Sequence, residues 1–90
     1  MYRIKQTSKY KKDLKRIKRR GYDISLLKVI IKKLSLGEKL DRKYKDHSLS
    51  GIFSGFRECH ITPDWLFIYR YEKEVLVLVL SQTGTHSDLF

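Results

Sequence analysis

Six consecutive apolar residues at positions 75–80, Val-Leu-Val-Leu-Val-Leu, constrain the fold of this 90-residue chain more than any other segment. The run lacks the polar alternation of a half-exposed strand, so both faces of the predicted strand at 75–81 should be covered, with helices packed on one side. A chain of this length hides only about 60 to 65% of its unfolded surface on folding, which leaves room for one simple core. We therefore expect a single domain over residues 1–90, with this strand in the interior of its sheet.

Two helices are predicted in the first half of the chain. The first has Ser8 as its N-cap and ends at Gly21, while the second is capped by Asp23 or Ser25 and ends near Gly37. The helices should form a hairpin, because each has its apolar residues at helical spacing on one side. These residues are Tyr10, Leu14 and Ile17 in the first helix, and Leu26, Leu27, Ile30, Ile31 and Leu34 in the second.

The rest of the chain is typical of an antiparallel sheet preceded by a long loop. Residues 38–55 are irregular and polar, with Gly51 and Gly55 as breakers, and loops of this length in small domains are often functional. The sequence thus predicts an α+β fold: an N-terminal strand, a two-helix hairpin and a β-meander. The predicted strands are residues 1–6, 56–62, 65–71 and 75–81, with turns at 62–64 and 72–74.

A strong positive charge points to an anionic partner. The chain has 20 Lys and Arg against 10 Asp and Glu, and ten of its first twenty residues are basic with only Asp13 opposing them. Such one-signed charge repels itself and is expected where phosphates supply the counter-charge, so RNA is favoured over an acidic protein or an anionic membrane. A second basic cluster in the long loop comprises Lys39, Arg42, Lys43 and Lys45.

The apolar segments and the single cysteine indicate a cytoplasmic protein. The longest apolar run, at 75–80, is too short to span a bilayer, so we expect no contact with a membrane. Cys59 cannot close an intramolecular disulfide, in agreement with a reducing compartment. Cys59 and His60 should point to opposite faces of one strand, which argues against a nucleophile and base pair.

RNA cleavage needs few catalytic groups from a protein, because the 2′-hydroxyl of the substrate is itself the nucleophile. A base, an acid and charge stabilisation are enough, and histidine and aspartate can provide them. His47, His60 and His86 all fall at the ends of predicted elements. The turn after His60 should place Asp64 and Trp65 at the same corner, whereas the distance to His86 depends on strand register. Trp65 either stacks on a base or packs as an ordinary strand residue.

A metal site is the competing use of these histidines. Their spacings of 13 and 26 residues match no short metal-ligand motif, and we expect neither a metal nor another cofactor. A metal-dependent hydrolase stays an alternative at this point.

An ordered set of short motifs resembles the YafQ-type branch of the RelE superfamily of bacterial toxins, over nearly the whole chain. The motifs are Tyr-Lys-Asp-His at 44–47, Phe-Arg-Glu-Cys-His at 56–60, Pro-Asp-Trp at 63–65, Tyr69, and Thr-Gly-Thr-His-Ser-Asp-Leu-Phe at 83–90. The resemblance implies a ribosome-dependent endoribonuclease that cuts mRNA and is held inactive by an antitoxin encoded beside it. The antitoxin should be acidic, since this chain is basic.

The resemblance also implies which residues act. His86 is expected as the general acid or base, with His60 and Asp64 sharing proton transfer and His47 contacting the phosphate or the leaving oxygen. Trp65 and Phe90 are expected to stack on bases. These expectations rest on the family pattern, which matches at positions 47, 60, 64, 65, 86 and 90. Lys45 is expected to contact the RNA because it belongs to the basic cluster of the long loop.

One position departs from the family. Members commonly have an arginine shortly before the Gly-X-His segment, and Gln82 stands there in this chain. Loss of one strong donor to a transition state costs about 10² to 10³ in rate, unless Arg57 or Arg70 supplies the charge instead. A non-catalytic RNA- or ribosome-binding module that lost its chemistry through Gln82 is therefore the first alternative.

Overall fold

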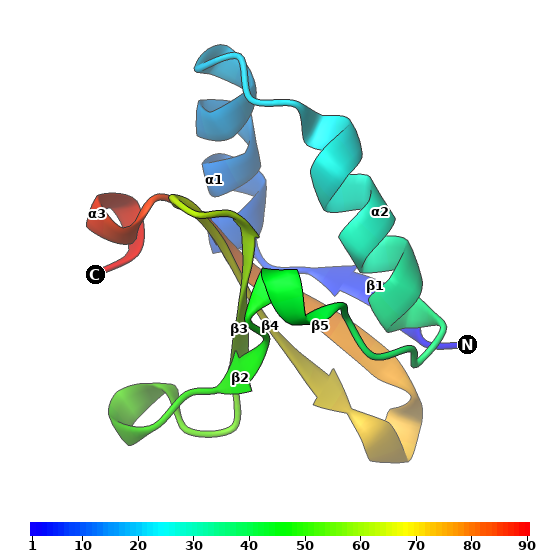
Figure 1. Cartoon of the computed structure of the whole chain (residues 1–90). Coiled ribbons are helices and arrows are strands. Elements are labelled where there is room, and N and C mark those ends of the chain that lie inside the picture. Colours follow the sequence, from blue (N-terminus) through cyan, green and yellow to red (C-terminus); the bar gives the residue numbers. More distant parts are fainter.

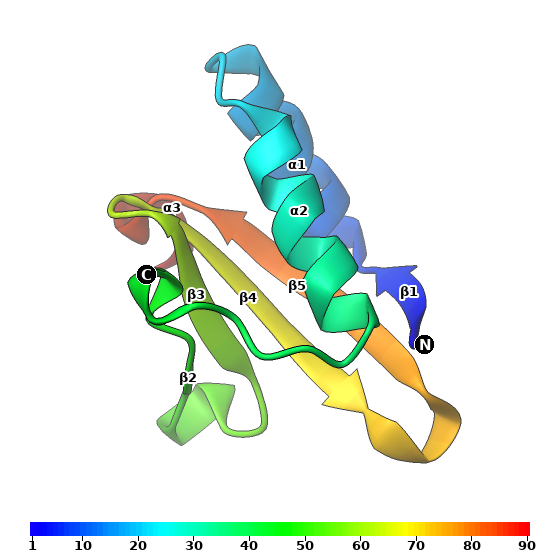
Figure 2. The ribbon, with the colours of Figure 1, turned by 45° about the vertical axis from the view of Figure 1, so that its right-hand side comes forward.

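The computed structural model describes all 90 residues, arranged as a five-stranded sheet with two helices packed on one face (Figures 1 and 2). The strand order is β1-β5-β4-β3-β2. The predicted meander of β3, β4 and β5 is confirmed, while β1 pairs with β5 in parallel. The elements are β1 (Arg3–Gln6), α1 (Ser8–Arg19), α2 (Ile24–Ser35), η1 (Arg42–Tyr44), β2 (His47–Ser48), η2 (Gly51–Phe53), β3 (Arg57–Thr62), β4 (Trp65–Glu72), η3 (Lys73–Val75), β5 (Val77–Gly84) and α3 (His86–Leu89), where η marks a short 3-10 helix.

The predicted helical hairpin is confirmed, with one change at its start. Thr7 caps α1 through its side chain in place of the predicted Ser8, which lies inside the helix. Asp23 caps α2, as one of the two predicted alternatives. Gly21 and Gly37 follow the helices with φ of 81° and 76°, a left-handed conformation that glycine adopts without steric cost.

The strand β5 begins and ends later than the predicted 75–81. Val75 ends the turn η3, and Leu76 follows with φ of 53°, so both side chains are more than half exposed. At its other end β5 continues to Gly84, because its last residues pair with the start of β4. The strand is interior as predicted, although β4 rather than β5 occupies the middle of the sheet.

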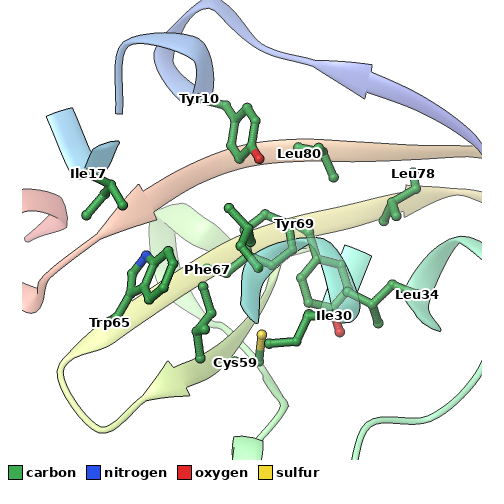
Figure 3. Packing of buried hydrophobic residues seen from close by; sticks show 12 residues of the cluster. Tyr10, Ile17, Ile30, Leu34, Cys59, Trp65, Phe67, Tyr69, Leu78 and Leu80 are labelled. Carbon is green, nitrogen blue, oxygen red and sulfur yellow. The ribbon is translucent and has the colours of Figure 1, made fainter. Parts of the chain in front are cut away.

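The core lies between the helices and the sheet (Figure 3). Burial of each large apolar side chain there contributes about 1.5 to 3 kcal/mol, so this layer holds both helices on one face of the sheet. Its twelve buried members are Tyr10, Ile17, Leu27, Ile30, Leu34, Cys59, Ile61, Trp65, Phe67, Tyr69, Leu78 and Leu80.

The other face of the sheet has no long helix, and we call it the helix-free face. Leu66, Ile68 and Val79 are buried there, on the side opposite to the core residues with which they alternate. The guanidinium of Arg70 lies over the ring of Phe56 at 5.4 Å from its centroid, so the chain after η2 covers part of this face. No helix of the chain is long and apolar enough to cross a bilayer.

Candidate active site

One row of paired residues crosses four strands on the helix-free face. Gln82 of β5 pairs with Ile68 of β4, Ile68 pairs with Glu58 of β3, and Glu58 pairs with His47 of β2. Residues directly opposite each other in an antiparallel pair project from the same face. His60 lies two residues beyond Glu58 on β3 and therefore joins them. The strand register thus brings two candidate histidines and Gln82 to one surface.

Glu58 is the carboxylate between the two histidines. Its Oε1 lies 3.6 Å from Nε2 of His47 and 3.8 Å from Nε2 of His60, and the two rings are 6.5 Å apart. The Glu58 residue is only 8% exposed. A proton on either Nε2 therefore creates an ion pair with a carboxylate that has little access to water.

The sequence interpretation missed Glu58, although a signal was present. An acidic residue two positions before a candidate histidine on a predicted strand shares its face. This alternation alone could have selected Glu58 as a partner of His60. It could not have revealed the contact with His47, which depends on the pairing of β2 with β3.

Hydrogen bonds to backbone carbonyls orient both imidazoles in the same way. Nδ1 of His47 lies 2.7 Å from the carbonyl oxygen of Lys45, and Nδ1 of His60 lies 3.3 Å from that of Pro63. In a neutral ring Nδ1 then holds the proton and donates it to the carbonyl, which leaves the Nε2 lone pair free. Lys45 has φ of 49° and ends the short helix η1, two residues before His47 begins β2. Both rings therefore present a proton-accepting nitrogen toward the Glu58 carboxylate.

Asp46 anchors the segment before His47 to the sheet. Its carboxylate accepts hydrogen bonds from the hydroxyl of Tyr69 at 2.5 Å and from the guanidinium of Arg57 at 3.1 Å. Burial, reinforced by the bond to Asp46, raises the pKa of the Tyr69 hydroxyl far above its ordinary value, so the hydroxyl stays a donor. The hydrogen bond to Asp46 likewise raises the pKa of Arg57.

This network corrects the interpretation of Arg57 as a substitute for the missing family arginine. Arg57 pairs with Tyr69, which is a core residue, and so projects from the helix-bearing side of the sheet. Its guanidinium is also occupied by Asp46 and by the hydroxyl of Ser48 at 2.8 Å. From this position Arg57 supports β2 rather than a phosphate on the helix-free face.

The expectation that Trp65 stacks on a base is wrong in this structure. Trp65 is 1% exposed, and its indole N–H donates to the hydroxyl of Thr83 at 2.9 Å. Figure 3 shows the ring in the core near Ile17 of α1, and the ring of Tyr22 meets it edge-on with centroids 5.1 Å apart. Strand alternation is the cause, because Trp65 shares its face with the core residue Phe67. The packing alternative is the one that holds.

His86 and Phe90 lie at the two ends of the short helix α3. Both side chains are exposed, their rings are 5.1 Å apart, and neither nitrogen of His86 has a hydrogen-bond partner in the chain. Phe90 also packs edge-on against Phe53 of η2, with centroids 5.4 Å apart. Figures 1 and 2 both show α3 beside the turn between β3 and β4. His60, on β3, contacts the carbonyl of Pro63 in that turn. The C-terminal segment therefore borders the site formed by the histidines on β2 and β3.

A cavity of about 460 Å³ opens beside His60. The candidate residue Lys45 lines it, and the candidate residue Asp64 lies in the turn nearby. Lys45 lines the cavity together with Lys43 and Tyr44, and no carboxylate is among the lining residues. Asp64 lies in the nearby turn, exposed to solvent, with the hydroxyl of Thr62 donating to it at 3.1 Å. The cavity is thus suited to an anionic group beside His60.

No three His, Cys, Asp or Glu side chains converge closely enough to hold a metal ion.

Two carboxylates occupy part of the predicted basic face of α1. Asp13 of α1 pairs with Lys9 and Arg16, and Asp88 of α3 pairs with Arg20 directly after α1. The exposed cations of α1 without an ion-pair partner are Lys11, Lys12, Lys15, Lys18 and Arg19.

Comparisons with known proteins agree on one family. Residues 2–90 match the family described as the bacterial toxin YafQ of type II toxin-antitoxin systems. The mRNA interferase toxin YafQ of Escherichia coli K12 is 36% identical over 88 residues, which cover 97% of this chain and 94% of the relative. A crystal structure of a metal-bound toxin from Helicobacter pylori superposes with a TM-score of 0.94 at 41% identity, covering 100% of both chains. In the E. coli DinJ-YafQ complex the matching chain has a TM-score of 0.90 and 33% identity, with 100% and 99% covered.

Proposed function

Because this chain belongs to the YafQ family of bacterial type II toxins, we propose that it is an endoribonuclease that cleaves mRNA on the ribosome. The observation that supports this most is the pair of imidazoles, His47 and His60, held around one buried carboxylate on the open face of the sheet. Two groups that exchange protons, near a surface rich in positive charge, are what transesterification of RNA requires.

The reaction needs one base and one acid on opposite sides of the phosphate. Nε2 of His60 or His47 removes the proton of the 2′-hydroxyl, whose oxygen attacks phosphorus and forms a new P–O bond. The P–O5′ bond breaks as His86 donates a proton to the leaving oxygen. The products are a 2′,3′-cyclic phosphate and a free 5′-hydroxyl, so atoms and protons balance without water or metal. The roles of His86 and the β3 histidine can exchange.

Glu58 serves this chemistry through the histidines. When either imidazole takes up a proton, the carboxylate at 3.6 to 3.8 Å stabilises the cation that forms. The carbonyls of Lys45 and Pro63 engage Nδ1 of each ring, so that Nε2 is the nitrogen left to exchange a proton beside Glu58. Asp64, which is exposed at the adjacent turn, orients the 2′-hydroxyl.

The substrate strand follows the remaining features of this face. The side chain of Gln82 has no hydrogen-bond partner in the chain and lies in the same row as Glu58, so its amide can donate to a phosphate oxygen. Phe90 is 52% exposed and offers a ring for base stacking, worth about 1 to 3 kcal/mol. Lys43 and Lys45 give the cavity beside His60 its positive charge for a neighbouring phosphate.

An acidic antitoxin is the expected protein partner. A relative with the same fold forms a complex with the antitoxin DinJ, and the formal charge of +10 on this chain would steer an acidic segment toward it. Covering the histidines of β2 and β3 would block substrate access directly.

The test is single-turnover mRNA cleavage on translating ribosomes by His86→Ala, His60→Ala and Glu58→Gln, with Ser87→Ala as the control. Ser87 is an exposed neighbour of His86 that the mechanism does not use. We expect losses of about 10² to 10⁴ for the histidine variants with ribosome binding retained, and no change for the control. Full cleavage by both histidine variants would contradict the mechanism.

The same assay separates the alternatives. Ribosome binding by the wild-type protein without any cleavage would favour the non-catalytic module. For the metal alternative, the toxin alone is treated with a chelator, which is removed before ribosomes are added in their Mg²⁺ buffer. Loss of cleavage by this treated toxin, with recovery on adding a transition-metal ion, would favour metal-dependent hydrolysis and replace the acid–base scheme.

A further inference from the structure

The helix that presents His86 is too short to be stable by itself. α3 has only four residues, His86–Leu89, whereas isolated helices shorter than about 12 to 15 residues are marginal in water. Its ring-bearing ends, His86 and Phe90, are both exposed, and α3 adds no residue to the buried core. Besides the ring contact of Phe90 with Phe53, the contacts that hold this turn in place are made by its polar residues.

Asp88 makes the local part of these contacts. It forms a capping box with Thr85: the Thr85 N–H donates to Oδ2 of Asp88 at 2.9 Å, and the Asp88 N–H donates to the Thr85 hydroxyl at 3.3 Å. Gly84 leaves room for this arrangement, because a Cβ there would lie 2.9 Å from both Cβ and Oδ2 of Asp88. The carboxylate is thus folded back over the start of its own helix.

The same carboxylate also joins α3 to the end of α1. The guanidinium of Arg20 donates to both oxygens of Asp88, at 2.6 Å to Oδ2 and 3.1 Å to Oδ1, across 68 positions of sequence. Nε of Arg16 also lies 4.0 Å from Oδ1 of Asp88. The α1 helix is itself fixed to β5, because Asp13 accepts a hydrogen bond from the Thr83 N–H at 3.1 Å. Arg20 therefore ties the short helix α3 to the end of α1, which is itself hydrogen-bonded to β5.

We propose that Arg20 and Asp88 are positioning residues for His86, and that their bidentate ion pair holds α3 in the orientation needed for cleavage. The proposal rests on the proposed function, in which His86 exchanges a proton with the substrate. A planar guanidinium on a carboxylate fixes direction as well as distance, which is the property that a proton donor on a single helical turn needs.

The ionisation of Asp88 is consistent with this role. The hydrogen bond from Arg20, followed by those from Thr85, holds the pKa of Asp88 far below its ordinary value. A carboxyl whose pKa is lowered in the folded protein stabilises the fold at pH values above its unfolded-state pKa. This stabilisation is lost only as the pH falls toward the lower pKa of the folded state. The pair therefore stays intact at neutral and mildly acidic pH, where the cleavage reaction would operate.

The principal experiment removes the tether without removing the cap. Arg20→Ala leaves the capping box intact. Lys28→Ala is the control, because Lys28 is an exposed cation of α2 with no ion-pair partner and lies outside the surfaces assigned to RNA and ribosome binding. In cleavage assays on ribosomes we expect Arg20→Ala to lower kcat about 10- to 100-fold at nearly constant KM, as for a misplaced catalytic group. Lys28→Ala should leave kcat unchanged, and Arg20→Lys should recover only part of the loss.

A double-mutant cycle tests whether Arg20 acts through Asp88. If it does, Arg20→Ala combined with Asp88→Asn should be no slower than Asp88→Asn alone. Additive losses, or a loss in Arg20→Ala that appears only in KM, would show that Arg20 acts on the ribosome and would overturn the proposal.

Amide hydrogen exchange of residues 86–90 in the free protein gives a readout that does not depend on cleavage. We expect faster exchange in Arg20→Ala than in Lys28→Ala, with exchange in β4 and β5 unchanged. Unchanged exchange in α3 would overturn the proposal even if the toxin is active. If exchange increases as expected but His86→Ala still cleaves, the proposed catalytic role of His86 fails while the role of the ion pair in ordering α3 stands.

Discussion

Replacement of Asp13, the single acidic residue of α1, should destabilise this protein strongly. Its side chain is 1% exposed and accepts three hydrogen bonds: from Lys9 at 2.5 Å, from Arg16 at 2.7 Å and from the backbone N–H of Thr83 at 3.1 Å. The last of these joins α1 to the strand that leads to Gln82 and His86. Asp13→Ala removes all three.

The magnitude follows from the surroundings of each contact. A buried N–H left without a partner costs about 1 to 3 kcal/mol, which applies to Thr83 because this residue is 0% exposed. Lys9 and Arg16 have side chains 49% and 35% exposed, so the loss of each ion pair costs only about 0.2 to 1 kcal/mol. Relief of the desolvated carboxylate offsets part of the sum. We expect a net loss of about 2 to 3 kcal/mol, or roughly 10 to 20 °C in Tm for a domain of this size.

Urea unfolding followed by Trp65 fluorescence provides the assay, since Trp65 is the single tryptophan and is buried. Asp13→Asn keeps an oxygen for the Thr83 N–H and should cost about 1 kcal/mol. Glu74→Ala is the control, because Glu74 is exposed without an ion-pair partner and should stay within about 0.5 kcal/mol of wild type. If Asp13→Ala is no less stable than Lys9→Ala, the bond to Thr83 contributes nothing and the reasoning fails.

Three other predictions concern the site, the charge and the cysteine. Gln82→Arg should raise single-turnover cleavage about tenfold or more with little change in binding, because Arg57 is engaged elsewhere; an unchanged rate would place the required cation at another residue. Reversing the charges of Lys12, Lys15 and Arg19 together should weaken ribosome binding and flatten its salt dependence at unchanged stability, and equal slopes for variant and wild type would mean a merely solvated face. Cys59 should resist iodoacetamide until the chain unfolds, since burial raises the pKa of its thiol well above the ordinary value; rapid labelling of the native protein would contradict the packing of β3.

Local patterns in the sequence predicted most of the elements correctly. Apolar spacing located both helices, and glycines at 21 and 37 marked their ends, because these signals act within a few residues. The strand β5 was misplaced at both ends for the same reason. The strand begins after a left-handed turn at Leu76 and ends where Gly84 pairs with Leu66. The run of apolar residues predicts neither feature.

The sequence named the histidines that the fold brings together, but neither Glu58 between them nor their geometry. His47 and His60 could be selected as histidines at element ends, yet their approach to 6.5 Å requires the pairing of β2 with β3. Trp65 was ambiguous in the sequence, because a tryptophan beside a turn suits stacking and packing equally well. The phase of β4 decided it, since the residues at 65, 67 and 69 face the core together. Asp88, which fixes α3, is recognisable only once Arg20 is seen beside it.

The positions of the arginines explain why glutamine at position 82, in place of the family arginine, matters for the helix-free face. Arg70, the second arginine named as a substitute, does lie on the helix-free face, but its guanidinium donates to Glu72 at 2.9 Å and lies over Phe56. The row of Gln82, Ile68, Glu58 and His47 then contains no fixed cation and one carboxylate. Positive charge for a phosphorane in that row can come only from protonated imidazoles or from the lysines beside the cavity at His60. A chain with Gln82 should therefore depend more on Glu58 than one with arginine at that position, because Glu58 is the group that stabilises the imidazolium form. In the Gln82→Arg background, the rate lost on Glu58→Gln should accordingly be smaller than in the wild-type background.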